Sequence, residues 1–403
     1  MRKEWPTKSL ADVCEVFSDG DWIESKDQSP EGIRLIQTGN IGQGVFKDRG
    51  EKARHISEET FNRLRCTEIF EGDCLISRLP DPVGRSCILP GTGERMITAV
   101  DCTIVRFNRR QLIPEFFNYY SQSLDYLKAV DAETTGTTRK RISRSKLGQV
   151  AIPVPPLPEQ RRIVNILDEA FADIAVAEAN MAQNLRNAQA LFESYLQAAF
   201  KDAWRSSELV TLADLATDIT DGDHLPPPKS PSGVPFITIG DIVKETRQID
   251  FSKTFMVPRA YFDALKPNKK PQKGDVLYTV TGSFGIPVIV KDNAEFCFQR
   301  HIGLIRPNSG TSSSWLYYLL LSPQVLRQAN AGATGTAQKT VSLKLLRSFR
   351  VPKVATKEQD VLATEFRALE AESARLASVY ERKLSELEAL KKSLLRRAFS
   401  GEL

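Results

Sequence analysis

The chain has 403 residues, of which 41% are hydrophobic, and a net charge of +5 at pH 7. Such a length can bury more than one core, so two or more domains are expected. No apolar run approaches the length of a membrane span, and the first residues lack the apolar stretch of a signal peptide. We therefore expect a cytoplasmic protein that does not contact a membrane.

The positive charge is concentrated in one part of the chain. Residues 205–357 contain 20 basic and 12 acidic residues, whereas residues 1–151 carry a net charge of only +1. An excess of +8 in one segment favours a polyanionic partner, although many soluble proteins carry as much.

The cysteines show no metal-binding spacing. None of them forms a CxxC pair, and five of the six lie in the first 102 residues. We interpret them as reduced and mostly buried thiols rather than a metal site. They are Cys14, Cys66, Cys74, Cys87, Cys102 and Cys297.

The chain contains an internal repeat of about 200 residues. Four blocks recur in the same order at offsets of 199 to 202, and a fifth continues from "EQRRIV" against "EQDVLA" through "QAAF" against "RRAF". The first four pairs are "SLADVCEVFSDGD" (9–21) with "TLADLATDITDGD" (211–223), "GIRLIQTGNI" (32–41) with "GVPFITIGDI" (233–242), "EGDCLIS" (71–77) with "KGDVLYT" (273–279), and "TTGTTRKRIS" (134–143) with "ATGTAQKTVS" (333–342). The chain is therefore predicted to be two copies of one unit.

Each copy is predicted to begin with a globular domain of the α+β class, at 1–157 and 205–353. Short β-branched and aromatic runs separated by Gly and Pro are typical of strands joined by turns. One short helix is predicted within 112–130 and its counterpart within 312–329.

Each copy is predicted to end in a long helix, at 158–204 and 354–403. Gly and Pro are absent from 159–205 and from 353–400. About 42 helical residues span ~60 Å, which is more than a small domain. The two helices are expected to pair as an antiparallel coiled coil with a globular domain at each end, giving a pseudo-twofold molecule.

A heptad frame assigns the expected seam between these helices. Position a is given to Leu167, Ile174, Met181, Ala188 and Tyr195, and to Phe366, Ser373, Tyr380, Leu387 and Leu394. Position d is given to Ile163, Ala170, Ala177, Asn184, Leu191 and Ala198, and to Leu362, Leu369, Leu376, Lys383 and Leu390. Asn184 and Lys383 are matching polar positions in this seam.

No motif for catalysis is found. The three histidines form no HxxxH or HExxH pattern, and neither a Walker loop nor a GxGxxG fingerprint is present. Pro80-Asp81 lies near no usable (D/E)xK triad, and the (D/N)PP(Y/F) motif of DNA amino-methyltransferases is absent. We therefore predict a non-catalytic chain that binds no metal or cofactor of its own.

The repeated loop at 134–143 is the strongest candidate for binding phosphates. Five of the eight residues from Arg139 to Lys146 are basic, and hydroxyls surround a central glycine. Backbone N–H groups of a glycine turn, hydroxyls and basic side chains all bind phosphate oxygens. The alternative is a charged loop that is merely solvated. The second copy of the loop at 333–342 keeps the glycine and the lysine but changes the neighbouring side chains, which favours a binding site. The candidates are Gly136, Thr137, Thr138, Arg139, Lys140, Arg141 and Ser143, and then Gly335, Thr336, Gln338, Lys339 and Ser342.

A few side chains are candidates for reading bases, because Arg and Gln can form paired hydrogen bonds with base edges. In the first domain they are Arg78, Arg85, Arg139 and Arg141, and in the second they are Ser283, Arg300 and Gln338.

The sequence resembles the specificity subunits of type I restriction-modification systems. "AIPVPPLPEQRRIVNILDEAFADI" is similar to the start of that family's central helix, and "LKKSLLRRAFSGEL" is similar to the end of its distal helix. "GDCLISRLPDPVGRSCI" is similar to its target recognition domains. The second Glu-Gln segment, "VPKVATKEQ", departs from the pattern because it lacks the Pro-Leu-Pro lead, which puts equal partner docking at the two sites in doubt.

The resemblance implies that 1–157 and 205–353 are target recognition domains, each reading one half of a split site in double-stranded DNA. It implies that the helices at 158–204 and 354–403 set the gap between the halves and dock two methyltransferase subunits. S-adenosylmethionine would then be bound by those subunits, and ATP and Mg²⁺ by partners that include a motor-nuclease subunit.

Two other functions remain open at this point. A coiled-coil scaffold would organise proteins without binding DNA even when a methyltransferase is present. An autonomous nuclease or methyltransferase with an unfamiliar site would show turnover on DNA with Mg²⁺ and S-adenosylmethionine.

Overall fold

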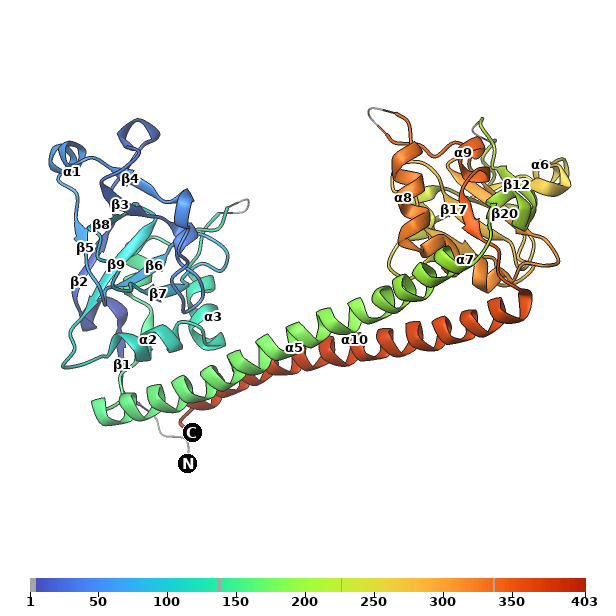
Figure 1. Ribbon diagram of the computed structural model, residues 1–403. Helices are drawn as coiled ribbons and strands as arrows, with labels where there is room; N and C mark the ends of the chain where they lie inside the picture. Colours follow the sequence, from blue (N-terminus) through green and yellow to red (C-terminus); the bar gives the residue numbers. More distant parts are fainter. Residues whose placement is uncertain (1–4, 137–138, 226, 336–337) are drawn as a thin grey trace. The chain divides into compact units, whose positions relative to one another are not determined.

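The protein is described here by a computed structural model covering residues 5–136, 139–225, 227–335 and 338–403. The chain forms two compact units. Unit 1 comprises Met1–Ala182 with Arg382–Leu403, and unit 2 comprises Gln183–Glu381. We call the globular part of unit 1 (5–156) head 1 and that of unit 2 (207–355) head 2; Figure 1 labels their elements.

Head 1 is built on two four-stranded sheets. The first is antiparallel with the order β2-β9-β6-β7, and the second has the order β4-β3-β8-β5, in which only β3 and β8 run parallel. A small sheet pairs β1 with β10. The strands are β1 Thr7–Ser9, β2 Cys14–Asp19, β3 Ile33–Ile36, β4 Arg54–Ile56, β5 Glu68–Ile69, β6 Cys74–Ser77, β7 Ser86–Ile88, β8 Met96–Thr98, β9 Cys102–Phe107 and β10 Ala151–Pro153.

Head 2 repeats this arrangement. Its main sheet has the order β12-β20-β17-β18, the second sheet has the order β16-β13-β19, and β11 pairs with β21 and β14 with β15. The strands are β11 Leu209–Thr211, β12 Ala216–Asp221, β13 Val234–Ile237, β14 Ile242–Val243, β15 Gln248–Ile249, β16 Phe255–Val257, β17 Val276–Thr279, β18 Pro287–Ile289, β19 Cys297–Phe298, β20 Ile302–Pro307 and β21 Arg350–Pro352.

The helices also repeat between the units. They are α1 Glu58–Leu64, α2 Pro114–Tyr120, α3 Leu124–Ala132, α4 Arg144–Gly148 and α5 Leu157–Ser206, then α6 Arg259–Asp263, α7 Ser313–Leu321, α8 Pro323–Gly332, α9 Leu343–Arg347 and α10 Thr356–Phe399. Short 3₁₀ turns are Leu10–Val13, Ser25–Asp27, Thr38–Asn40, Gly50–Lys52, Leu212–Leu215, Ile239–Asp241, Phe251–Lys253 and Pro267–Lys269.

The short helix predicted in each head is confirmed as α2 and α7, but both regions also contain a second helix, α3 or α8, that was not predicted. Ser123 Oγ accepts a hydrogen bond from Tyr126 N at 3.3 Å, and Ser322 Oγ accepts one from Val325 N at 3.4 Å. Each serine therefore caps a new helix, which ends the helix before it.

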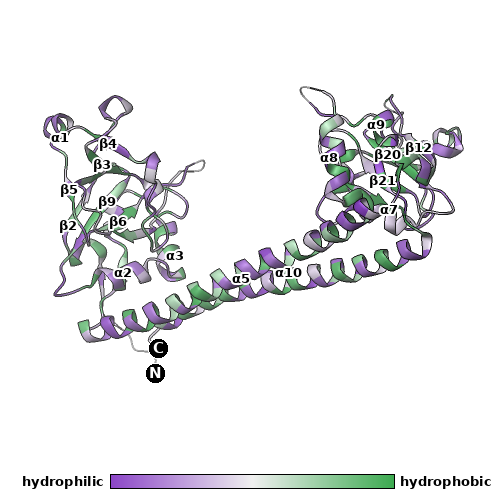
Figure 2. Cartoon of the chain, in the orientation of Figure 1, coloured by the Kyte–Doolittle hydropathy of each residue, from purple (hydrophilic) through white to green (hydrophobic). Residues whose placement is uncertain are grey.

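Each head shares its core with both long helices. In unit 1, Ile163 and Leu167 of α5 and Leu395 and Ala398 of α10 are buried in one cluster with residues of head 1 such as Phe116. The same construction in unit 2 buries residues of α5 and α10 against Trp315 and its neighbours. The strands of each head are largely hydrophobic, whereas hydrophobic and hydrophilic residues alternate along the long helices (Figure 2). The heads are therefore packed onto the helices rather than tethered to them.

Within each unit the long helices run antiparallel. In unit 1, Lys391 Nζ lies 2.7 Å from Glu178 Oε2, and Arg162 Nη2 donates to the Leu403 carbonyl at 2.8 Å. In unit 2, Tyr195 Oη donates to Glu365 Oε2 at 3.0 Å, and the Ser373 hydroxyl donates to the Ala188 carbonyl. The predicted α+β class with two long antiparallel helices is confirmed.

The predicted heptad phase is only partly correct. Position a is buried at Leu167, Ile174 and Phe366, but the d residues Leu191 and Leu390 are 44% and 45% exposed. Tyr195, predicted at a, is 40% exposed, and the seam in that stretch is made by residues such as Phe192, Leu196 and Phe200. A helix with 3.6 residues per turn drifts by ~20° per heptad, so its buried face leaves a strict frame. Head 2 fixes the new face by burying these side chains in its core.

The cysteine prediction is confirmed for the described residues. Five of the six thiols are buried and Cys14 is partly exposed, and none forms a disulfide. Burial raises the pKa of the Cys87 and Cys102 thiols to about 12, so both stay protonated and unreactive near neutral pH. No helix in the described part of the chain is both long and apolar enough to cross a bilayer.

We expect Phe366→Ala to destabilise unit 2 by about 3–5 kcal/mol, because it removes a large side chain from a close-packed site. Phe366 is fully buried and its ring stacks on Phe200 at a centroid distance of 5.4 Å. Denaturant unfolding of the full chain measures the loss. Val361→Ala on the same helix removes a side chain that is 57% exposed and should change stability by less than about 0.5 kcal/mol. Equal effects of the two changes would contradict the shared core.

Candidate nucleic-acid interface

The repeated loop forms the same tight hairpin in both heads. Thr135 and Arg141 exchange two backbone hydrogen bonds of 2.9 Å, and Thr334 and Thr340 exchange bonds of 3.0 and 2.7 Å. The two loops are therefore closed in the same way, while Arg139 and Arg141 of the first are replaced by Gln338 and Thr340 in the second.

A glycine is required at the same place in each hairpin. Gly136 has φ +99° and Gly335 has φ +112°, a region that residues with a side chain rarely adopt. A Cβ at Gly136 would lie 2.6 Å from the Arg139 carbonyl oxygen, and one at Gly335 would lie 2.2 Å from that of Gln338. Both glycines thus allow the far side of the turn to lie close.

Each hairpin lies against the end of the central strand of its head. Ile142 N donates to the Arg78 carbonyl at 3.3 Å, directly after β6. In head 2, Val341 N donates to Val280 O at 2.8 Å and Gly282 N donates to Lys339 O at 3.0 Å, directly after β17. In head 1 the segment after β6 and the hairpin are far apart in sequence but lie together. The segment after β17 and the hairpin of head 2 lie together in the same way.

Serine ends each hairpin by starting a short helix. Ser143 Oγ accepts a hydrogen bond from Lys146 N at 3.3 Å, and Ser342 Oγ accepts one from Leu345 N at 3.2 Å. Both serines are exposed, but their oxygens are occupied as helix caps. Their first role is thus to fix the direction in which the hairpin leaves the head.

Basic side chains of the head 1 hairpin form ion pairs with acidic side chains. Lys140 Nζ lies 2.5 Å from Asp131 Oδ1, and Arg141 Nη2 lies 3.0 Å from Asp101 Oδ1. Each of these basic side chains is about half exposed. Pairs this exposed are worth at most about 1 kcal/mol, so a phosphate or a base edge can replace the acid.

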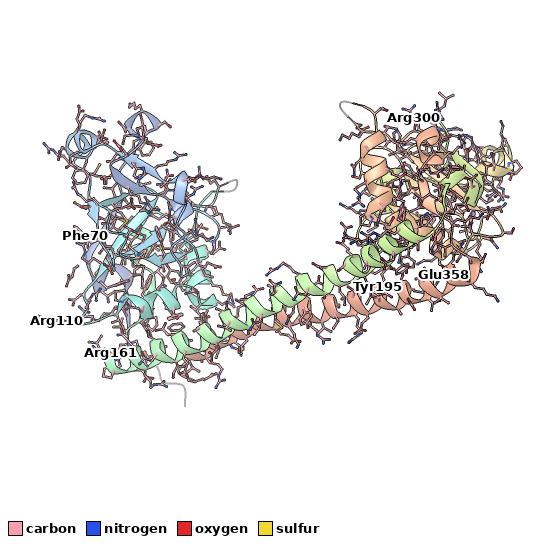
Figure 3. All side chains as sticks on the ribbon, in the orientation of Figure 1. Phe70, Arg110, Arg161, Tyr195, Arg300 and Glu358 are labelled. Carbon is pink, nitrogen blue, oxygen red and sulfur yellow. The ribbon has the colours of Figure 1, made fainter. Side chains whose placement is uncertain are left out.

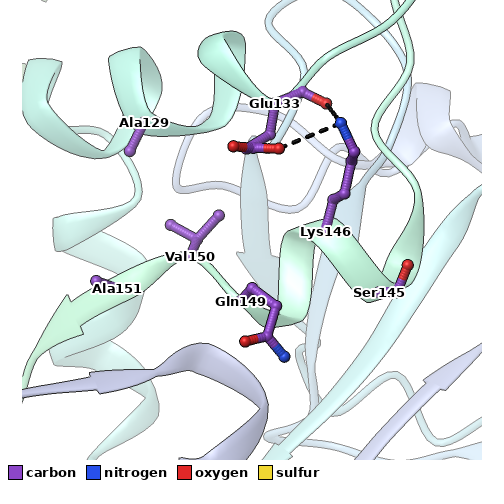
Figure 4. A pocket seen from close by; sticks show the side chains of 7 residues that line it. All are labelled: Ala129, Glu133, Ser145, Lys146, Gln149, Val150 and Ala151. Carbon is purple, nitrogen blue, oxygen red and sulfur yellow. Dashed lines mark hydrogen bonds and ion pairs between the residues drawn. The ribbon is translucent and has the colours of Figure 1, made fainter.

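A pocket beside the hairpin shows how its base is held. Lys146 of α4 reaches Glu133, at the end of α3, with Nζ 3.2 Å from Oε2 and 3.5 Å from the carbonyl oxygen (Figure 4). This open pocket of about 450 Å³ is also lined by Ala129, Ser145, Gln149, Val150 and Ala151. The ion pair between Glu133 and Lys146 therefore holds the two ends of the hairpin loop close to each other.

Head 2 presents different groups on the same frame. Ser283, Gln338, Lys339 and Arg300 are exposed, and Figure 3 labels Arg300 at the surface of head 2. Arg300 Nε lies 3.4 Å from His301 Nε2. Burial, with the nearby Arg300 charge, lowers the pKa of His301, so this imidazole is neutral at pH 7.

Two predicted base readers of head 1 are buried, and the structure does not support a direct base contact by either. Arg85 is 7% exposed and donates to four backbone carbonyls, those of Leu79, Ile41, Thr38 and Pro82, at 2.6 to 3.0 Å. Its guanidinium holds the 38–41 segment against the loop after β6. Burial lowers the pKa of Arg85, but an arginine stays charged in this setting.

Arg78 is buried in the same way. It is 4% exposed, donates to the Val100 carbonyl, and lies 3.2 Å from Asp19 Oδ1. It therefore supports the strand end on which the hairpin rests. Thr137, Thr138 and Thr336, which were also predicted to bind, lie outside the described residues.

The residue directly before β9 in head 1 and before β20 in head 2 was not predicted from the sequence to belong to the site. Asp101 pairs with Arg141 in head 1, and His301 contacts Arg300 and Gln299 in head 2. The two positions correspond, because Arg78 N donates to Asp101 O and Val280 N donates to His301 O, both at 2.9 Å. Alignment of the strands "CTIVRF" and "IGLIRP" gives this signal.

Within the described part of the chain, no group of three or more His, Cys, Asp or Glu residues is placed to hold a metal ion. The arrangement instead offers two hairpins whose described residues include exposed hydrogen-bonding side chains, Arg139 and Lys140 in head 1 and Gln338 and Lys339 in head 2. Such a surface can bind a polyanion and contact base edges.

The comparisons with known proteins agree on one family. The model described as "Type I restriction modification DNA specificity domain" matches residues 2–183 and 206–380. The EcoBI specificity subunit of a type I restriction enzyme from Escherichia coli is 22% identical over 79% of this chain and 70% of its own length. The putative MjaX specificity subunit from Methanocaldococcus jannaschii is 21% identical over 100% of this chain and 94% of its own.

Solved structures show the same fold. A chain from a study of complex assembly and conformational transition of the type I R-M system aligns with a TM-score of 0.79 and 20% identity, covering 100% of this chain and 99% of that one. The HsdS subunit from Thermoanaerobacter tengcongensis aligns with a TM-score of 0.62 and 19% identity, covering 100% and 98%.

We expect Arg85→Ala to destabilise head 1 by about 2–4 kcal/mol, because the carbonyls that it binds lose a charged donor. Thermal unfolding of the full chain, with hydrogen exchange of the 38–41 and 79–85 segments, measures the effect. Arg139→Ala removes an exposed arginine of the hairpin and should leave stability within about 0.5 kcal/mol of the original. A stable Arg85→Ala protein with altered DNA sequence preference would show instead that Arg85 reads bases.

Proposed function

Because the chain belongs to the type I restriction modification DNA specificity family, we propose that each of its heads reads one half of a bipartite site in double-stranded DNA. The chain is a specificity subunit, a DNA-recognition component and not a catalytic one. The observation that carries the proposal is that the two loops are closed by the same backbone hydrogen bonds but carry different side chains, Arg139 and Arg141 in head 1 and Gln338 and Thr340 in head 2.

The two kinds of residue at the hairpins have different tasks. Lys140 and Lys339 occupy the same place in the repeat and bind phosphate, which carries no sequence information. Arg139 and Arg141 in head 1 face base edges where head 2 has Gln338 and Thr340. Arginine prefers guanine and glutamine prefers adenine, so the heads select different bases.

The long helices set the gap between the half-sites and dock two methyltransferase subunits. Support comes from large apolar side chains on their exposed faces, which a partner protein would cover. Val176 is 62% exposed and Val361 is 57% exposed, and Leu191, Tyr195 and Leu390 are each between 40% and 45% exposed. S-adenosylmethionine would be bound by the methyltransferase subunits, and ATP and Mg²⁺ by partners that include a motor-nuclease subunit.

The test is to express the chain with its methyltransferase subunit and to map methylated adenines across the host DNA. Two short sequences separated by a constant gap are expected. Methylation without such a motif would contradict bipartite reading, and a complex that binds no DNA at all would mean that the chain is a scaffold.

We expect Lys140→Ala and Lys339→Ala to weaken binding to every DNA sequence alike, because each removes one phosphate contact. The slope of log affinity against log salt should fall by about 0.9 for each change. Binding titrations of the methyltransferase complex between low and physiological salt measure it. Lys357→Ala is the control and should leave the slope unchanged. Lys357 lies in the first turn of α10, which begins beside Gly310, after the end of β20. The hairpin lies near the start of β20, at the other end of the sheet. A loss confined to one target sequence would refute a phosphate role.

A further inference from the structure

The second residue of the repeated Glu-Gln pair is buried in both units. Gln160 lies in the first turn of α5 and Gln359 in the first turn of α10. Their exposed fractions are 0% and 1%, although the residues around them are largely exposed. A glutamine is rarely buried completely, so its hydrogen bonds must be made within the protein.

Both glutamines make the same three hydrogen bonds. Gln160 Oε1 accepts from Ile113 N at 2.9 Å, and its Nε2 donates to Gln111 O at 2.8 Å and Pro155 O at 2.7 Å. Gln359 Oε1 accepts from Ser312 N at 2.7 Å, and its Nε2 donates to Gly310 O at 3.1 Å and Val354 O at 2.8 Å. Both N–H groups and the oxygen are occupied, so the amide can adopt only one orientation.

The bonds join the start of a long helix to one particular loop of the head. In head 1 this loop connects β9 to α2, and in head 2 it connects β20 to α7. Shared hydrophobic contacts hold the head on the helices but have no preferred direction. Hydrogen bonds from a buried amide do have one, so they fix the angle at which the head meets its own helices.

That angle matters because the hairpin lies at the other end of the same strand. β9 has six residues, with the clamped loop after its end and Asp101 directly before its start. Six residues of strand span ~20 Å. A tilt of about 10° at the loop would move the hairpin by ~3.5 Å, which is close to the ~3.4 Å rise of one base pair.

We propose that Gln160 and Gln359 are positioning residues that fix the gap between the two half-sites. This inference rests on the proposed function. Each glutamine acts through the angle of its head and contacts no DNA. A head freed from its clamp still reads the same bases, but it tolerates a gap that is one base pair too long or too short.

The test compares duplexes that carry the cognate half-sites with the natural gap and with gaps one base pair longer or shorter. Gln160→Met and Gln359→Met fill a similar volume but cannot make the hydrogen bonds. The affinity of the methyltransferase complex for the natural gap, relative to the altered gaps, should fall about tenfold, as the loss of one or two buried hydrogen bonds implies. Gln197 is an exposed glutamine of α5, the helix that carries Gln160, and Gln197→Met should leave the ratio of these affinities unchanged.

Three results would overturn the proposal. An unchanged ratio in both variants means that the clamp does not control the gap. An equal loss for all three duplexes means that the glutamines serve folding alone, and hydrogen exchange at the amides of Ile113 and Ser312 locates that loss. A changed base preference within a half-site also contradicts the proposal. Failure of the proposed function is distinct, because the original complex would then show no preference for any gap.

Discussion

The structure depends on the burial of one face of each long helix in the core of a head. Residues of α5 and α10 share a single cluster with head 1 in unit 1 and another with head 2 in unit 2. A head without the helices would expose this apolar surface, and the helices without the heads would expose the side chains that they bury in the two clusters. Head and helices therefore form one structural unit, which places the reading surface in a defined direction relative to the helices that support it.

This construction explains which parts of the sequence are free to vary. A glycine with positive φ and paired backbone hydrogen bonds close each hairpin, so side chains such as Arg139 and Gln338 can differ without altering that closure. Arg141 pairs with Asp101 in head 1, whereas the corresponding positions in head 2 hold Thr340 and His301. At these two positions head 1 thus has an arginine paired with an acid, and head 2 has neutral side chains. Two unlike surfaces on one frame are what separate half-site specificities require.

Much of the fold follows from the sequence because it rests on local and repeated signals. The repeat, the absence of Gly and Pro from 159–205 and 353–400 and the glycine of each hairpin are visible in the residues alone. The phase of the helix seam is different, because it depends on which side chains the head captures; Phe192 rather than Leu191 faces the core. The break at Ser123 also depends on the choice between continuing a helix and capping a new one.

The candidate site was predictable in its hairpins but not in its supports. Arg85 looked like a reader because arginine in a turn is usually exposed, yet the structure buries it against backbone carbonyls of distant loops. Its counterpart in the second copy is Ile286, since Arg85 O and Ile286 O each accept from the last residue of the central strand. An apolar residue at the matching position was the available signal that this arginine is internal.

The central claim is that the heads read separately on a common support, and a domain exchange tests it most directly. Residues 1–157 are replaced by the corresponding head of a related specificity subunit with a different target, and methylated adenines are mapped for the original and the hybrid complex. The account predicts that one half of the recognised sequence changes while the other half and the gap stay the same. A change in both halves, or in neither, would contradict it.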